Sequence, residues 1–281
     1  MGRKKSILKK VFVSSLLFAL VVGSGFAQRN YYENPKYGKD SASRVECLKN
    51  LSLYREYIKQ DNIKDAVYGW KEVYQICPKA TKNIYIDGVD IVKNAIKNAE
   101  DDATKEKLVD SLMAVYDKRM KYFNQEGFVL GRKGVDYLRY RSSNPEDVRK
   151  AYEILEKSID IRKGESEAAV LVTFMTATES LFKSDEISGD QVISNYDKIM
   201  GFVEQELAQN PNDKKAQVIE KNVNIIFERS GAATCESLIK LYKPKFKENP
   251  EDQELLTKII NLLDETGCKE SDLYFNVAAK L

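Results

Sequence analysis

The sequence predicts an all-α protein of about 11–12 helices that pair into stacked antiparallel hairpins. From Ser43 onward, apolar residues recur at helical spacing, as in Leu108, Leu112, Val115 and Tyr116. Turn-forming residues interrupt this pattern at intervals of about one helix. No run alternates polar and apolar residues convincingly enough to indicate a half-buried strand. These three observations favour helices joined by short turns, and hence neighbours that pack side by side.

The expected helices follow from the breaks between them. The first two are expected over 43–60 and 64–77, with a turn near Asp61 and Asn62. In three later breaks Asn precedes Pro, and an acidic residue follows shortly. We expect this Asn to cap the next helix and Pro to occupy its first turn. All later breaks lie at 77–81, 100–104, 124–127, 142–147, 162–166, 183–190, 209–213, 248–252 and 265–271.

The first 27 residues have the three-part organisation of a secretory signal peptide. Five basic residues and no acidic one occur in the first ten positions, and twelve almost wholly apolar residues follow at 11–22. Gly25 and Ala27 then lie at −3 and −1 of an expected cleavage site. An uncleaved membrane anchor is the alternative, but the apolar run is shorter than the roughly 20 residues that span a bilayer. We expect an exported protein, periplasmic or associated with the outer membrane, with no membrane span after cleavage.

The remainder of the chain divides into a leader and a helical domain. Residues 28–42 are polar, tyrosine-rich and aperiodic, which indicates a flexible leader before a helical domain at 43–281. The formal net charge is +2, but without the five basic residues of the signal the chain holds 40 basic and 43 acidic residues. A nearly neutral, mixed charge creates no long-range field for nucleic acid, which is therefore not an expected partner.

Four cysteines can pair in three ways, and export would permit disulfides. In an antiparallel hairpin, facing residues lie equally far from the turn. Cys47 and Cys77 are centred on position 62, and Cys235 and Cys268 on position 251.5, both within expected turns. The spacing therefore predicts two disulfides, each closing one hairpin. A four-cysteine zinc site and free buried thiols are the alternatives, although the close Cys-x-x-Cys pairs typical of zinc sites do not occur.

The second expected helix carries the pattern of a repeat family. Four residues have the spacing of the small, aromatic, small and proline positions that close a tetratricopeptide repeat: Ala66, Trp70, Val73 and Pro78. Three more match positions of the first helix or of the next unit: Leu53, Tyr57 and Gly88. The chain thus resembles an exported bacterial tetratricopeptide-repeat protein with degenerate repeats. The match is good only over about 47–92; later units keep a few positions, namely Ala151, Leu155, Pro211 and Pro250.

This resemblance implies a right-handed α-solenoid whose first helices line a concave groove. The groove would hold a peptide or a helix of a partner protein. The residues expected to contact this partner are Arg55, Lys82, Tyr85 and Val89, and further positions of the same face are Leu48, Leu51, Ile58 and Val92. The alternative is that core contacts fill this face, since apolar residues at helical spacing usually belong to a core.

The composition argues against catalysis. The chain has no histidine, so Ser/His and Cys/His nucleophile arrangements are impossible and the commonest metal ligand is missing. We predict no catalytic, cofactor-binding or metal site, and no enzyme. The segment GFVLGRKG at 127–134 is glycine-rich and basic, but it follows a helix and lacks the GK[ST] ending of a phosphate loop. It is predicted to be an interhelix turn. In YLRYR at 137–141, packing and binding roles for Tyr137 and Tyr140 are equally open.

Two functions are compatible with these patterns. The first is a protein-protein interaction scaffold of the cell envelope, as the repeat resemblance implies. The second is a carbohydrate-binding or envelope-processing accessory role, for which exposed tryptophans would be typical. The single tryptophan, Trp70, occupies a packing position, which favours the scaffold.

The last expected helix begins after Gly267. Its apolar stripe, Tyr274, Val277, Ala278 and Leu281, ends at the final residue. Repeat arrays usually finish with a polar outer face. We therefore expect either a shortened version of a longer array or a face that docks against something else.

Overall fold

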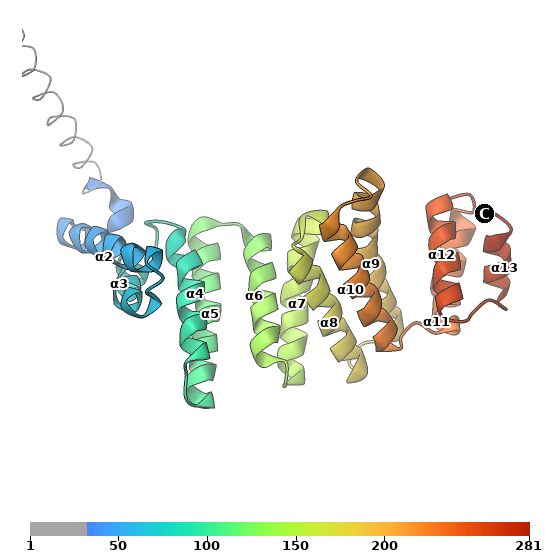
Figure 1. Ribbon diagram of the computed structural model, residues 1–281, viewed down its shortest axis with the longest axis horizontal. Coiled ribbons are helices and arrows are strands. Elements are labelled where there is room, and N and C mark those ends of the chain that lie inside the picture. The colour runs from blue at the N-terminus through green and yellow to red at the C-terminus, as the bar shows by residue number, and fades with distance from the viewer. Residues whose placement is uncertain (1–32) are drawn as a thin grey trace, which may run out of the picture. The chain divides into compact units, whose positions relative to one another are not determined.

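The computed structural model describes residues 33–281, and over this range the protein contains twelve α-helices, two short 3₁₀ helices and no β-strand (Figure 1). The all-α prediction and the expected number of helices are therefore confirmed. The signal-peptide prediction for residues 1–27 lies outside the described residues. Among residues 33–281, no helix combines the length and the apolar character that crossing a bilayer requires.

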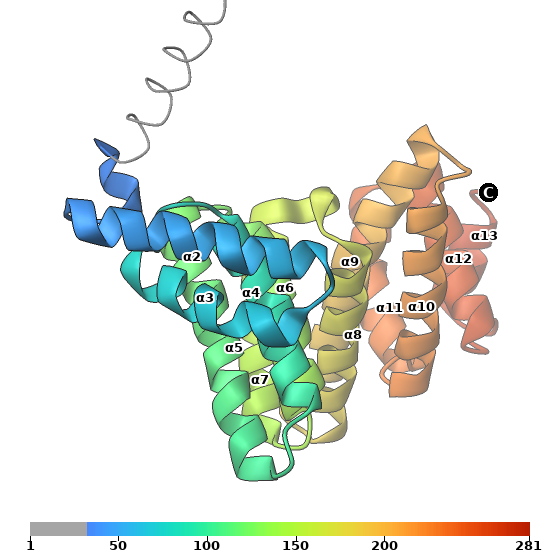
Figure 2. The same ribbon diagram turned by 60° about the vertical axis from the view of Figure 1, so that its left-hand side comes forward.

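The chain separates into two compact units at Asn124 and Gln125. In the first unit, each α-helix packs against the next one along the chain. The pairs α2 with α3 and α4 with α5 lie side by side in two views (Figures 1 and 2). The elements of this unit are η1 (Pro35–Tyr37), α2 (Ser41–Lys59), α3 (Ile63–Ile76), α4 (Asn83–Lys97) and α5 (Asp102–Phe123).

In the second unit, each α-helix packs against the next one from α6 to α10 and again from α11 to α13. In addition, α8 contacts both α6 and α10, and α9 contacts α11, so each of these helices also touches the next but one. The elements are α6 (Glu126–Arg141), α7 (Pro145–Arg162), η2 (Lys163–Glu165), α8 (Ala168–Lys183), α9 (Gly189–Gln209), α10 (Lys214–Ser230), α11 (Cys235–Glu248), α12 (Gln253–Glu265) and α13 (Asp272–Ala278).

Polar side chains begin most of these helices, as their sequence signals predict. Asn144 caps α7 by accepting a hydrogen bond from the Glu146 amide at 3.0 Å, and a proline occupies the first turn. The other two Asn-Pro pairs behave differently from the prediction. Asn210 and Asn249 end the preceding helices, and the caps of α10 and α12 are Asp213 and Asp252. In both turns the proline lies in the connection, and the aspartate two residues after it adopts the N-cap conformation and accepts from the helix amides.

Part of the expected leader is folded. Residues 35–37 form η1, which packs against α2 and buries Tyr37. Asp40 and Ser43 form a reciprocal capping box: Asp40 accepts from the Ser43 amide at 2.8 Å, and Ser43 accepts from the Asp40 amide at 3.1 Å. Helix α2 therefore begins at Ser41, two residues before the expected start.

The segment 127–134 is not a turn, which corrects the prediction. It lies inside α6, and its three glycines recur at spacings of four and three, which places them on one helical face. A Cβ on Gly127 would lie 2.7 Å from Ile161, and one on Gly134 would lie 2.6 Å from Leu155, both on α7. The glycines are therefore needed for close contact between α6 and α7, because any larger residue would collide.

The structure joins Cys47 to Cys77 and Cys235 to Cys268, the pairing that the spacing predicts. The Cα atoms are 6.0 and 5.4 Å apart, and the described cysteines include no free thiol. The first disulfide joins the open end of the α2–α3 hairpin, and the second joins the start of α11 to the segment after α12.

Trp70 anchors the contact between α3 and α4. Its ring is buried, and its Nε1 donates a hydrogen bond to the Ile84 carbonyl at 2.7 Å. A Cβ on Gly88 would lie only 2.8 Å from Trp70 Nε1. The indole thus occupies the space that a side chain at position 88 would need.

The disulfides can be tested by non-reducing peptide mapping, which should recover both hairpin links. Replacing Cys47 and Cys77 together by Ala should lower the free energy of unfolding by about 3–4 kcal/mol, because a closed loop of this length restricts the unfolded chain. A link between the two hairpins in the native protein would contradict the prediction.

Gly88→Ala should destabilise the first unit. Overpacking in a buried contact costs about 1–3 kcal/mol, which exceeds the 0.5–1 kcal/mol or so that Ala contributes over Gly inside a helix. The matched control is Gly201→Ala in α9, where a Cβ would have no atom within 4 Å and the free energy of unfolding should rise. Urea unfolding measures both. If both substitutions changed the free energy of unfolding equally, the Trp70 indole would have to move away from position 88 without an energetic cost.

Candidate functional site

The residues predicted to line a groove lie on α2 and at the start of α4. Arg55 and Lys82 are exposed and Val89 is half-buried. Tyr85 is fully buried, and its hydroxyl donates a hydrogen bond to the Pro78 carbonyl at 2.8 Å. Tyr85 is therefore not available to a partner, and for this position the alternative prediction of a core contact is correct.

Tyr85 is the centre of an aromatic cluster that reaches the surface. Its ring centroid lies 5.8 Å from that of Tyr74 on α3 and 6.5 Å from that of Tyr122 on α5. Phe123 contacts the same ring at 5.7 Å, and Trp70 extends the row beyond Tyr74 at 5.2 Å. Tyr74 and Tyr122 are only half-buried, so two rings of the cluster are accessible on either side of the buried Tyr85.

Lysines lie over both accessible rings. Lys118 Nζ is 3.8 Å from the Tyr74 centroid, whereas Lys79 and Lys121 lie 5.9 and 5.5 Å from that of Tyr122. Such contacts stabilise an ammonium group through the electron-rich face of the ring. We call these five residues, Tyr74, Lys79, Lys118, Lys121 and Tyr122, the aromatic-lysine surface.

The lysines of this surface have aromatic partners and no acidic ones. Within residues 33–281, no carboxylate forms an ion pair with Lys79, Lys118 or Lys121. Burial lowers the pKa of Lys118, and repulsion from Lys121 lowers it further. Burial, with the nearby Asp117 carboxylate and Tyr122, raises the pKa of Tyr74 to about 12, so its hydroxyl remains protonated at neutral pH.

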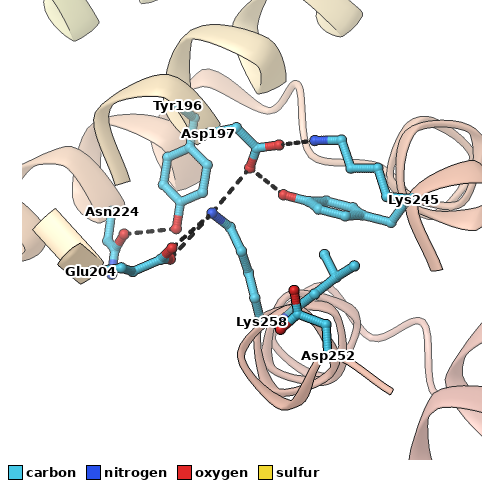
Figure 3. Close-up of polar contacts among 9 residues, drawn as sticks. Tyr196, Asp197, Glu204, Asn224, Lys245, Asp252 and Lys258 are labelled. Atoms are coloured by element: carbon cyan, nitrogen blue, oxygen red, sulfur yellow. Dashed lines mark hydrogen bonds and ion pairs between the residues drawn. The ribbon is translucent and has the colours of Figure 1, made fainter. Parts of the chain in front are cut away.

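The second unit contains a charged cleft of about 250 Å³ between α9, α11 and α12 (Figure 3). Asp197 on α9 is its centre. It accepts hydrogen bonds from the Tyr242 hydroxyl and from Lys245 Nζ, the latter at 2.6 Å, and it forms an ion pair with Lys258 at 3.3 Å. Figure 3 shows Lys258 reaching from α12 between Asp197 and Glu204, and its Nζ is 3.2 Å from Glu204 Oε1.

The cleft is a satisfied ionic network. The side chains of Asp197 and Lys258 are only 14% and 15% exposed, so water contributes little to their solvation. Burial raises the pKa of Glu204 even though Lys258 opposes the shift. Lys258 pairs with both Asp197 and Glu204, and Lys245 pairs with Asp197, so these charged groups already have partners within the cleft. The arrangement therefore suits the attachment of α11 and α12 to α9 better than catalysis.

Neighbouring contacts fix the orientation of this network. Tyr196, beside Asp197, stacks on Phe227 of α10 with 4.0 Å between ring centroids. Its hydroxyl donates to Asn224 at 2.9 Å, as Figure 3 shows. Asp252 at the edge of the cleft is occupied as the cap of α12. Among the described residues, no group of three or more Cys, Asp or Glu side chains is arranged to hold a metal ion.

Sequence reasoning found neither site. The cleft combines residues from three helices, and no local spacing relates Asp197 to Lys245 or Lys258. The aromatic-lysine surface had a weak signal, because Lys118, Lys121 and Tyr122 recur at helical spacing on one face of α5. What the sequence did not show is that Tyr74 of α3 lies under Lys118.

Comparison with known proteins adds no relative: no protein-family model matches the chain, and no similar curated protein was found.

Lys258→Met should destabilise the second unit, because it leaves Glu204 half-buried without a cation. The free energy of unfolding, measured with urea near pH 7.5, should fall by about 2 kcal/mol. Because the pKa of Glu204 is raised in the folded protein, stability linked to this group is present at low pH and is lost as pH rises through that pKa. Removing Lys258 raises this pKa further, so the loss should shrink toward pH 5.

The double variant Lys258→Met with Glu204→Gln is the control for this prediction. It should recover part of the lost stability and show a weaker dependence on pH, because the titrating carboxyl is absent. A single variant as stable as the wild type at pH 7.5 would show that the network contributes nothing.

Proposed function

We propose that the protein is a non-catalytic scaffold of the bacterial cell envelope that binds a partner protein or peptide. In this proposal the helical hairpins form a right-handed, tetratricopeptide-like solenoid. The partner contacts the aromatic-lysine surface of the first unit, and Arg55, Lys82 and Val89 on α2 and α4 provide a second contact face.

One observation carries the proposal. Three lysines gather over two accessible tyrosine rings without an acidic partner among the described residues. Aromatic rings bordered by cations contribute strongly to binding at protein interfaces, because they bury a large area and lose little conformational freedom. The charged cleft of the second unit differs, since its buried charges already pair with one another.

Export is supported by the basic, apolar and small-residue order of residues 1–27 and by the two disulfides, which persist in oxidising compartments. The carbohydrate-binding alternative is less favoured. Trp70 is only 6% exposed and packs against Gly88, so it offers no platform for a sugar ring.

Site-specific photocrosslinking in the native envelope tests the proposal. A benzoylphenylalanine at Tyr122 should give a discrete crosslinked partner, identified by mass spectrometry. The matched control is the same replacement at Tyr68, a 68% exposed tyrosine of the same unit, which should not give it. The purified partner should then bind the mature protein in calorimetry, and Lys118→Gln with Lys121→Gln should weaken binding. Identical crosslinks at both positions, or no binding by the purified partner, would contradict the proposal.

A further inference from the structure

We propose that the aromatic-lysine surface recognises an acidic protein segment, whose carboxylates pair with Lys118, Lys121 and Lys79 while its apolar groups cover Tyr74 and Tyr122. This inference rests on the proposed scaffold function and specifies the chemistry of the partner. It concerns α3, α5 and the loop before α4, and not the face of α2 and α4 on which the repeat resemblance places a groove.

The environment of Lys118 differs from that of comparable lysines in the same protein. Lys245 and Lys258 are also partly withdrawn from water, and each lies within 3.3 Å of a carboxylate oxygen. Lys183 likewise pairs with the buried Glu179 at 2.6 Å. Lys118, by contrast, lies on a tyrosine ring, and another ammonium group, that of Lys121, acts on it. A carboxylate from outside would supply the missing counter-charge.

The hydroxyl of Tyr74 provides a hydrogen-bond donor in addition to the positive charge of Lys118. The pKa of Tyr74 is about 12, so the phenol keeps its proton, and Asp117 lies close enough to contribute to that shift. A protonated phenol beside an ammonium group can bind one carboxylate through both oxygens. Lys118 and Tyr74 together therefore form one carboxylate-binding position.

Lys79 and Lys121 over Tyr122 form the second position. Tyr74 and Tyr122 both contact Tyr85, at 5.8 and 6.5 Å, so a single short segment can reach both. Extended residues advance about 3.3 Å each, which favours acidic residues two to four positions apart with an apolar residue between them.

Charge distribution favours a peptide over a polyanion. The surface holds three lysines, and the carboxylate of Asp117 lies beside it. Nucleic acids and anionic membranes present dense, continuous negative charge, which binds most strongly to large basic patches. Residues 28–281 carry no such excess, with 40 basic against 43 acidic side chains.

Fluorescence anisotropy on the mature protein tests this inference with labelled peptides of defined sequence. The acetylated, amidated peptide GELEGELEG is compared with its neutral match GQLQGQLQG at 50 and 150 mM NaCl. We expect the acidic peptide to bind about tenfold more tightly, and Lys118→Gln with Lys121→Gln to remove most of that difference. The control variant is Lys214→Gln with Lys221→Gln on α10, two exposed lysines whose loss should leave binding unchanged.

A second readout follows the amine of Lys118 directly. Because its pKa is lowered, Lys118 should react with an acylating reagent faster than Lys214, and the acidic peptide should slow that reaction. Peptide mapping after a short exposure gives both rates. Thermal unfolding checks that the Gln variants fold, which is expected because the three lysines lie at the surface.

Equal affinity for the acidic and neutral peptides would overturn the inference, as would equal loss of affinity in the α10 control. Binding of single-stranded DNA or of phosphatidylglycerol vesicles with the same dependence on Lys118 would also overturn it. If a purified partner binds through Tyr122 while the acidic peptide does not bind, the scaffold function stands and this inference fails. Peptide binding without any crosslinked partner would instead support the site and contradict the scaffold function.

Discussion

Helices can approach closely only where one of them presents a small residue, and this steric constraint determines much of the structure. At the α3–α4 contact, Gly88 leaves room for the Trp70 indole. At the α6–α7 contact, Gly127 and Gly134 let Ile161 and Leu155 approach the backbone. Each glycine weakens its own helix slightly, since Gly is a poorer helix former than Ala. The packing gained by close approach offsets that loss.

Polar contacts then determine which helices pair. In the second unit the buried Asn195 donates hydrogen bonds to Tyr152 on α7 and Thr178 on α8, at 3.1 and 3.0 Å. Burial opposes ionisation of Glu179, but hydrogen bonds from Arg229 and Lys183 lower its pKa. A buried polar group without these partners would cost free energy, so alternative helix pairings are disfavoured.

The free-energy cost of burying a charge without a partner also distinguishes the two sites. In the cleft between α9, α11 and α12, each partly buried charged group lies within 3.3 Å of an opposite charge. This network attaches α11 and α12 to α9. On the aromatic-lysine surface, tyrosine rings hold the ammonium groups, and among residues 33–281 no carboxylate forms an ion pair with these three lysines. Rings stabilise a cation less than a carboxylate does at close range. This difference is why we place the proposed partner on the aromatic-lysine surface and not in the cleft.

Local sequence determined the helices and the cysteine pairing, because capping, helical period and distance from a turn depend on residues near one another in the chain. Asn144 caps α7, and Cys47 lies opposite Cys77, for these local reasons. The sequence was misleading for 127–134, since glycines that favour a turn in isolation are retained in a helix by contact with α7. Only the tertiary structure decided that Tyr85 is buried, that Lys118 lies over Tyr74 and that Lys258 lies between Asp197 and Glu204. These contacts join residues far apart in the chain, and packing between helices, which no local pattern records, brings them together.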